Sequence, residues 1–127
     1  MTRPGECDRR VRSLLEVVYD FSDAEIETLL LLCRAGEARV AELSTLAGKD
    51  RSTVQRLLTR LTSTGLICRE SRCCTGPKKG RYFIYRLVPP AELRSKIKAR
   101  TRQWYSERMA AIETFDWPSP DRRGPGS

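Results

Sequence analysis

The stretch from Gly48 to Leu66 constrains the fold of this chain more than any other part of the sequence. Its apolar residues recur at the i, i+3, i+4 and i+7 spacing of one helix face, and they are Val54, Leu57, Leu58 and Leu61. Asp50 stands at a suitable N-cap position, and Gly65 stands where a left-handed residue would end the helix. The sequence therefore predicts an amphipathic helix over about residues 51–63.

The opposite face of this predicted helix is polar and holds no carboxylate. It comprises Arg51, Ser52, Thr53, Gln55, Arg56, Thr59 and Arg60. Guanidinium, hydroxyl and amide groups are the ones that contact phosphates and base edges in the DNA major groove. A solvated helix face is the alternative, but such a face normally mixes both signs of charge. We therefore interpret this segment as a DNA recognition helix.

The net charge of the chain lies in one contiguous third of the sequence. Residues 49–86 hold ten cations against only Asp50 and Glu70, so this segment alone accounts for the formal charge of +8. The cations are Lys49, Arg51, Arg56, Arg60, Arg69, Arg72, Lys78, Lys79, Arg81 and Arg86. Such clustering indicates a polyanionic partner, and we expect these side chains to share one surface.

Three helices and a short strand are expected before the recognition helix. The first helix covers residues 8–19 after a flexible N-terminus of residues 1–7, with Val11, Leu14, Leu15 and Val18 directed inward. Ser22 and Glu25 form a capping-box pattern that opens the second helix, which directs Ile26, Leu29, Leu30 and Cys33 inward and ends at Gly36. A short strand at 38–40 and a helix at 41–47, with Leu43 and Leu46 inward, complete a helix-turn-helix pattern.

A β-hairpin follows the recognition helix. Residues 66–73 and 81–88 have strand character, and the intervening segment contains Gly76, Pro77 and Gly80. Phe83, Tyr85 and Leu87 are expected to face the core. A basic hairpin tip at 74–81 is typical of a wing that lies on the flanking backbone or in the minor groove. The expected backbone contacts are Ser44, Lys49, Thr59, Arg60, Lys78, Lys79 and Arg81. A charged loop that prevents edge-to-edge aggregation is the alternative.

The sequence predicts a long helix over residues 91–115, about 37 Å in length at 1.5 Å per residue. Its apolar seam is expected to form a homodimer interface, because so small a domain cannot cover it. The residues assigned to that interface are Leu93, Ile97, Trp104, Ala111, Ile112 and Phe115. A helix folded back onto its own domain is the alternative. Residues 116–127 are rich in proline, glycine and serine and are expected to be disordered.

The segments Ala41–Ile67 and Gly80–Pro90 together resemble the winged-helix domain of TrmB-like and MarR-like transcriptional regulators, especially small archaeal ones. The resemblance implies that Arg51, Ser52, Thr53, Gln55 and Arg56 face the major groove while the wing holds the backbone. It also implies dimers that bind inverted repeats. Longer TrmB-like regulators carry a C-terminal sugar-sensing domain, whereas this sequence ends at Ser127, so sugar sensing is not expected.

The chain has five cysteines, an odd number that cannot all pair within one chain. Cys33 is expected to be a buried apolar residue. Cys68, Cys73 and Cys74 lie among the cations of the hairpin, where thiolates are stabilised, so they are candidate redox or metal ligands. The alternative is plain reduced thiols, because the spacing is not C-x2-C and the chain has no histidine to complete a site.

Several classes of protein are disfavoured by the composition. No apolar run reaches the ~18–20 residues of a membrane span, and no signal-peptide pattern opens the chain, so we expect a cytoplasmic, nucleoid-associated protein. Without histidine, and without a nucleophile constellation or phosphate loop, no enzyme is expected, and no cofactor or metal is implied.

The resulting hypothesis is a mainly α-helical winged helix-turn-helix domain over residues 8–90, followed by a dimerisation helix. Its partners are double-stranded DNA and a second copy of the chain. The leading function is a sequence-specific transcriptional regulator that binds inverted repeats. The alternatives are a non-specific architectural nucleic-acid binder, a regulator that responds to redox or metal through the wing cysteines, and a winged-helix interaction module that does not use DNA.

Overall fold

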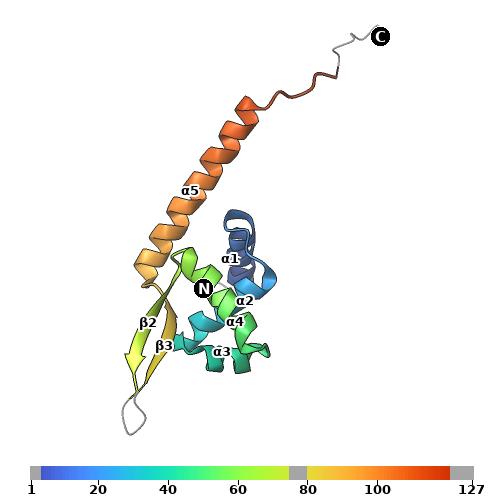
Figure 1. Cartoon of the computed structure of the whole chain (residues 1–127). Coiled ribbons are helices and arrows are strands. Elements are labelled where there is room, and N and C mark those ends of the chain that lie inside the picture. The colour runs from blue at the N-terminus through green and yellow to red at the C-terminus, as the bar shows by residue number, and fades with distance from the viewer. Residues whose placement is uncertain (1–3, 75–79, 121–127) are drawn as a thin grey trace.

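The computed structural model describes residues 4–74 and 80–120 of the chain. Within these residues the elements follow the order expected of a winged helix with a long final helix (Figure 1). They are α1 (Pro4–Val18), α2 (Asp23–Ala35), β1 (Glu37–Ala38), α3 (Val40–Ala47), α4 (Arg51–Ser63), β2 (Ile67–Cys73), β3 (Arg81–Leu87) and α5 (Pro90–Thr114). The mainly helical fold with a small hairpin wing is therefore confirmed.

The first helix begins earlier than the sequence predicted. α1 starts at Pro4, four residues before its predicted start at residue 8. Proline suits the first helical turn because its φ is already helical and its missing N–H would have no partner there. Leu15 and Val18 are buried as expected, whereas Val11 is 38% exposed.

Helix α2 begins and ends as its caps predict. Ser22 Oγ accepts from the Glu25 N–H at 3.2 Å, and Glu25 Oε1 accepts from the Ser22 N–H at 2.7 Å. Gly36 ends the helix at φ +83°, in the region that favours glycine. The prediction that Cys33 is buried is wrong, because the buried stripe of α2 passes through Leu29 and Leu32 and leaves Cys33 exposed.

Strand β3 lies at the centre of an antiparallel sheet with the order β1-β3-β2. Tyr85 pairs with Ala38 on one side and Arg69 on the other, and it is only 2% exposed, so its predicted inward position is confirmed. The prediction for Phe83 is wrong, because Phe83 lies farther along the wing and is 43% exposed. Ile84 is buried instead, on the opposite sheet face.

The core lies where helices α1–α4 meet the inner face of the sheet. Val54, Leu58 and Leu61 of α4 are at most 1% exposed and belong to one cluster of buried residues with Tyr85. Leu43 of α3 joins that cluster, but Leu46 is 58% exposed, contrary to its predicted inward position. α4 is therefore fixed by its apolar stripe, which leaves its polar face available.

Helix α5 is divided between two environments. Leu93, Ile97 and Trp104 pack against the core of their own domain, as in the folded-back alternative. The distal half of α5 projects beyond the domain (Figure 1), and there Ile112 and Phe115 are 53% and 56% exposed. Of the residues predicted for the dimer interface, those in the first half of α5 therefore pack on their own domain. Those in the distal half are left exposed by the described residues of their own chain. The predicted tail beyond residue 115 lies partly outside the described residues, and its Trp117 Nε1 donates to the Ile112 carbonyl at 2.9 Å.

Candidate nucleic-acid interface

The turn between α3 and α4 sets the direction in which α4 leaves the domain. Gly48 adopts φ +67° at the end of α3, and the Ser44 hydroxyl donates to the Lys49 carbonyl. The Ser44 hydroxyl thus stabilises the turn, and its predicted phosphate contact stays a prediction. Lys49 is half-buried.

Polar side chains at the start of α4 are held by hydrogen bonds to one another. Ser52 Oγ donates to Asp50 Oδ2 at 2.6 Å, which lowers the pKa of the Asp50 carboxyl. Arg56 Nη2 lies 3.4 Å from Thr53 Oγ1. Arg51, Ser52 and Arg56 are exposed, and Thr53 is half-buried. This end of α4 therefore offers two guanidinium groups and two hydroxyls to a ligand.

Gln55, one of the predicted base-contacting residues, forms a hydrogen bond with a residue of the wing. Its Nε2 donates to Tyr85 Oη at 3.1 Å, although the two residues are 30 positions apart. Thr59, one turn later, donates from Oγ1 to the Gln55 carbonyl at 2.9 Å and remains exposed. This flank of α4 therefore faces the wing.

Arg60 makes contacts within the domain that the sequence did not predict. Its Nη2 donates to the Tyr19 carbonyl at 3.3 Å, its Nε lies 3.3 Å from Glu25 Oε2, and its guanidinium lies 5.7 Å from the Phe21 ring centroid. These contacts join the last turns of α4 to the start of α2. We therefore propose that Arg60 contributes to the stability of the domain; because it remains exposed, its predicted DNA contact stays a prediction.

The inner face of the wing carries a cation that sequence reasoning did not assign. Arg69 is exposed, shares the sheet face of its cross-strand partner Tyr85, and lies 4.2 Å from the Phe83 ring centroid. A cavity of about 310 Å³ separates α4 from the wing, lined by Thr59, Thr62, Ser63, Arg69 and Tyr85. Alternation alone would have found Arg69, because paired residues of antiparallel strands point to the same face.

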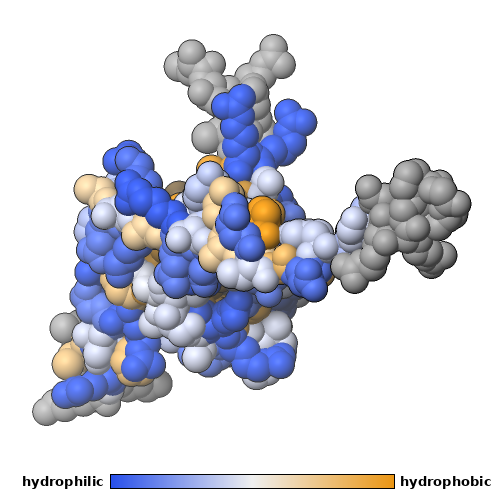
Figure 2. All heavy atoms as spheres, turned by 90° about the horizontal axis from the view of Figure 1, so that it is seen from above, coloured by the Kyte–Doolittle hydropathy of each residue, from blue (hydrophilic) through white to orange (hydrophobic). Residues whose placement is uncertain are grey.

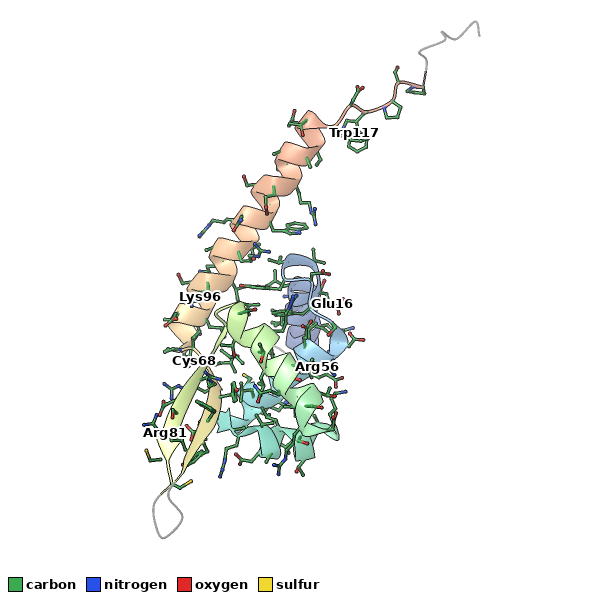
Figure 3. The ribbon with its side chains drawn as sticks, in the orientation of Figure 1. Glu16, Arg56, Cys68, Arg81, Lys96 and Trp117 are labelled. Atoms are coloured by element: carbon green, nitrogen blue, oxygen red, sulfur yellow. The ribbon has the colours of Figure 1, made fainter. Side chains whose placement is uncertain are left out.

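Arg81 lies on β3 near the end of the wing, and Arg56 lies on α4 (Figure 3). Both are exposed. The predicted tip contacts Lys78 and Lys79 lie outside the described residues. Hydrophilic side chains dominate the molecular surface seen from above (Figure 2).

The outer face of the wing is charged but paired. Arg72 contacts Glu37 and Glu70, each at 2.9 Å, and Arg86 also contacts Glu70. Hydrogen bonds from Arg72 and Arg86 lower the pKa of the Glu70 carboxyl. The expectation that all ten cations share one surface is therefore wrong for Arg72 and Arg86.

The wing cysteines do not come together. Cys68 pairs with Arg86 on the outer face, near the end of the hairpin that adjoins α5, whereas Cys73 pairs with Arg81 far along the hairpin (Figure 3). Five residues of extended strand span roughly 16 Å, too far for one metal ion to bind both. Among the residues that the structure describes, no group of three metal-ligating side chains forms a site. Cys68 and Cys73 therefore cannot bind one metal ion together within one chain, whereas a redox role for Cys68, Cys73 or Cys74 stays a prediction.

The sequence of this chain matches a protein-family model. The model described as "Sugar-specific transcriptional regulator TrmB" matches residues 15–91, which is more than half of the chain. The protein belongs to the TrmB family. The matched region runs from α1 to the first residues of α5 and contains the whole of α4 and the wing. The family consists of transcriptional regulators instead of enzymes.

Two archaeal proteins are similar in sequence to this chain. An uncharacterized protein of Methanocaldococcus jannaschii is 23% identical over 105 residues, covering 83% of this chain and 78% of that protein. A second uncharacterized protein of the same organism is 27% identical over 95 residues, covering 75% of this chain and 77% of that protein.

Solved structures show the same fold. A possible transcriptional regulator from Methanosarcina mazei Go1 superposes with a TM-score of 0.69 at 16% identity, covering 84% of this chain and 89% of that chain. A protein from the thermoacidophilic archaeon Sulfolobus tokodaii superposes with a TM-score of 0.62 at 17% identity, covering 84% of this chain and 98% of that chain.

In the described part of this TrmB-family chain, no helix has both the length and the apolar character needed to cross a membrane.

Proposed function

We propose that this TrmB-family protein regulates transcription by binding specific double-stranded DNA as a homodimer. The observation that carries the proposal is the distribution of its cations. Arg51 and Arg56 on α4 and Arg69 and Arg81 on the wing are exposed. On the outer wing face, by contrast, Arg72 and Arg86 are paired with carboxylates. This asymmetry favours a duplex on the side of α4 and the inner wing face.

The two parts of this surface suit different contacts. Arg51 and Arg56 can pair with guanine, and Gln55 with adenine, because each offers the hydrogen-bonding groups that those base edges match in the major groove. Arg69 and Arg81, together with the predicted tip contacts Lys78 and Lys79, supply phosphate contacts beside the site. These contacts position the protein without selecting a sequence.

The distal half of α5 supports the homodimer. Tyr105, Met109, Ile112, Phe115 and Trp117 are between 41% and 62% exposed. Tyr105, Met109 and Ile112 recur at steps of four and three, which places them on one helix face. An unpartnered apolar stripe on a projecting helix fits the same stripe of a second copy. Two recognition helices would then lie about one DNA turn, ~34 Å, apart on an inverted repeat.

The test is selection of preferred duplexes from a randomised pool, followed by titration of the selected and a scrambled duplex at several salt concentrations. We expect a preferred inverted repeat, two chains per duplex, and an affinity that falls steeply with salt for both duplexes. Equal affinity for the two duplexes would instead identify a non-specific architectural protein. Absence of binding to either duplex would overturn DNA recognition altogether.

A further inference from the structure

The Gln55–Tyr85 hydrogen bond joins the recognition helix to the wing. Gln55 is an exposed residue of α4, and its Nε2 lies 3.1 Å from Tyr85 Oη. Tyr85 is 2% exposed, and its ring belongs to the core cluster. A long, exposed side chain on the candidate DNA face is therefore tied to an anchored one.

The anchor itself is well supported. Tyr85 lies on the central strand β3, where it pairs with Ala38 of β1 and with Arg69 of β2. It belongs to the same buried cluster as Leu58 and Leu61 of α4. Because strands and helices hold the ring on several sides, the position of its hydroxyl is fixed before any ligand arrives.

The chemistry of a carboxamide makes this contact useful. The amide of Gln55 has two N–H donors and one oxygen acceptor. One N–H is used on Tyr85, which leaves the second N–H and the oxygen for a base. A donor beside an acceptor is the pattern that matches adenine N7 and N6 in the major groove. The bond to Tyr85 therefore restrains the side chain while leaving its base-contacting groups free.

From this geometry we propose that Tyr85 is a specificity-determining residue that acts by positioning Gln55. It does not contact DNA itself. Its hydroxyl holds the carboxamide of Gln55 in the orientation that contacts a base edge, so less side-chain freedom is lost on binding. The inference rests on the proposed function, because it concerns a base contact, and it adds a wing residue to the groups that set sequence preference.

The chain offers a matched control for the loss of a tyrosine hydroxyl. Tyr82 lies on the same strand as Tyr85 but on the opposite sheet face, where its ring contacts Arg39 at 4.2 Å from the ring centroid. Tyr82→Phe and Tyr85→Phe each remove one hydroxyl and keep the ring. A difference between the two variants therefore reports on the Gln55 contact.

The experiment compares the wild type with Tyr85→Phe, Tyr82→Phe, Gln55→Ala and the double variant Gln55→Ala/Tyr85→Phe. Base preference is measured at every position by selection from a randomised duplex pool, and affinity for random duplex and Tm are measured beside it. Gln55→Ala identifies the base pair that Gln55 contacts. We expect Tyr85→Phe to relax preference at that same base pair by ~2- to 10-fold, the range of one net hydrogen bond. Affinity for random duplex should stay at the wild-type value.

Tyr82→Phe should keep the wild-type preference, and the double variant should match Gln55→Ala alone. A Tyr85→Phe variant that keeps full preference, or that relaxes preference equally when Gln55 is already alanine, would overturn the role of Tyr85. A change in Tm alone would assign Tyr85 to stability and would also overturn it. A wild type without any sequence preference would overturn the proposed function itself, and with it this inference.

Discussion

Arg72 of β2 and Glu37 of β1 form an ion pair across β3, the strand between theirs, with 2.9 Å from Nη1 to Oε2 and 3.1 Å from Nη2 to Oε1. The Nε of Arg72 also donates to Glu70 at 2.9 Å. These bonds connect β2 to β1, and the bond from Arg86 to Glu70 adds β3, so the charges of the outer face are paired with one another. The wing therefore has one paired face and one face with the exposed cations Arg69 and Arg81.

This division predicts different results for two arginines on one strand. Arg69→Gln should weaken binding to specific and random duplexes alike and reduce the slope of log affinity against log salt by about 1, because a phosphate contact is lost. Arg72→Gln should leave the affinity and the slope unchanged and lower Tm slightly. Titration at several salt concentrations measures both effects. Equal losses from the two variants would show that total charge, instead of the face on which it lies, governs binding.

Arg60 contacts other parts of its own domain, whereas Arg56 is exposed at the start of α4, so replacing each should have a different effect. Arg60→Ala should lower the free energy of unfolding by about 1 kcal/mol or less, because its partly exposed ion pair with Glu25 contributes modestly. Arg56→Ala should leave stability unchanged and reduce DNA affinity. Denaturant unfolding and duplex titration on both variants make the comparison. Loss of affinity in a fully stable Arg60→Ala variant would instead support the predicted DNA contact of Arg60.

Arg56 and Arg60 show which features of α4 could be predicted from the sequence and which could not. The apolar spacing of Val54, Leu58 and Leu61 predicted α4 correctly, because local periodicity reports which stripe of a helix is buried. It could not separate Arg56 from Arg60. That distinction depends on Tyr19, a residue 41 positions from Arg60 that only the tertiary fold brings beside it.

Local sequence signals also located the two strands of the wing, but they did not identify which of its side chains are buried. Turn residues and strand composition located both strands, but alternation assumed one buried face and one exposed face. Ile84 departs from this pattern, since its neighbours on the outer face, Tyr82 and Arg86, and its cross-strand partner Glu70 surround it. Phe83 departs in the other direction, because the wing extends beyond the core and leaves its inner face open there.

The outer-face ion pairs also predict a dependence of stability on pH. Arg72 and Arg86 lower the pKa of Glu70 in the folded state below its ordinary value of 4.5. The ionised carboxylate therefore stabilises the fold above pH 4.5, and this contribution is lost as the pH falls through the lowered folded-state pKa. Glu70→Gln should have a lower Tm than the wild type near neutral pH, and the difference should shrink in acid. A difference that stays constant across this range would contradict the linkage.

The distal half of α5 provides the sharpest test of assembly. Ile112→Glu should keep the chain monomeric, because Ile112 is 53% exposed in one chain and a carboxylate at this position would be buried without a partner in the proposed dimer. Thr114→Glu is the matched control, since Thr114 is two residues away on the opposite side of the helix and is exposed. Sedimentation velocity gives the mass of each variant, and circular dichroism checks that α5 remains folded.

The same pair of variants connects assembly to DNA recognition. A monomer presents one recognition helix instead of two, so the affinity of Ile112→Glu for an inverted repeat should fall to that for a single half-site. Thr114→Glu should bind the repeat as tightly as the wild type. A dimeric Ile112→Glu variant would place the interface elsewhere. A monomeric one that still binds the full repeat with wild-type affinity would show that the two half-sites are not engaged together through α5.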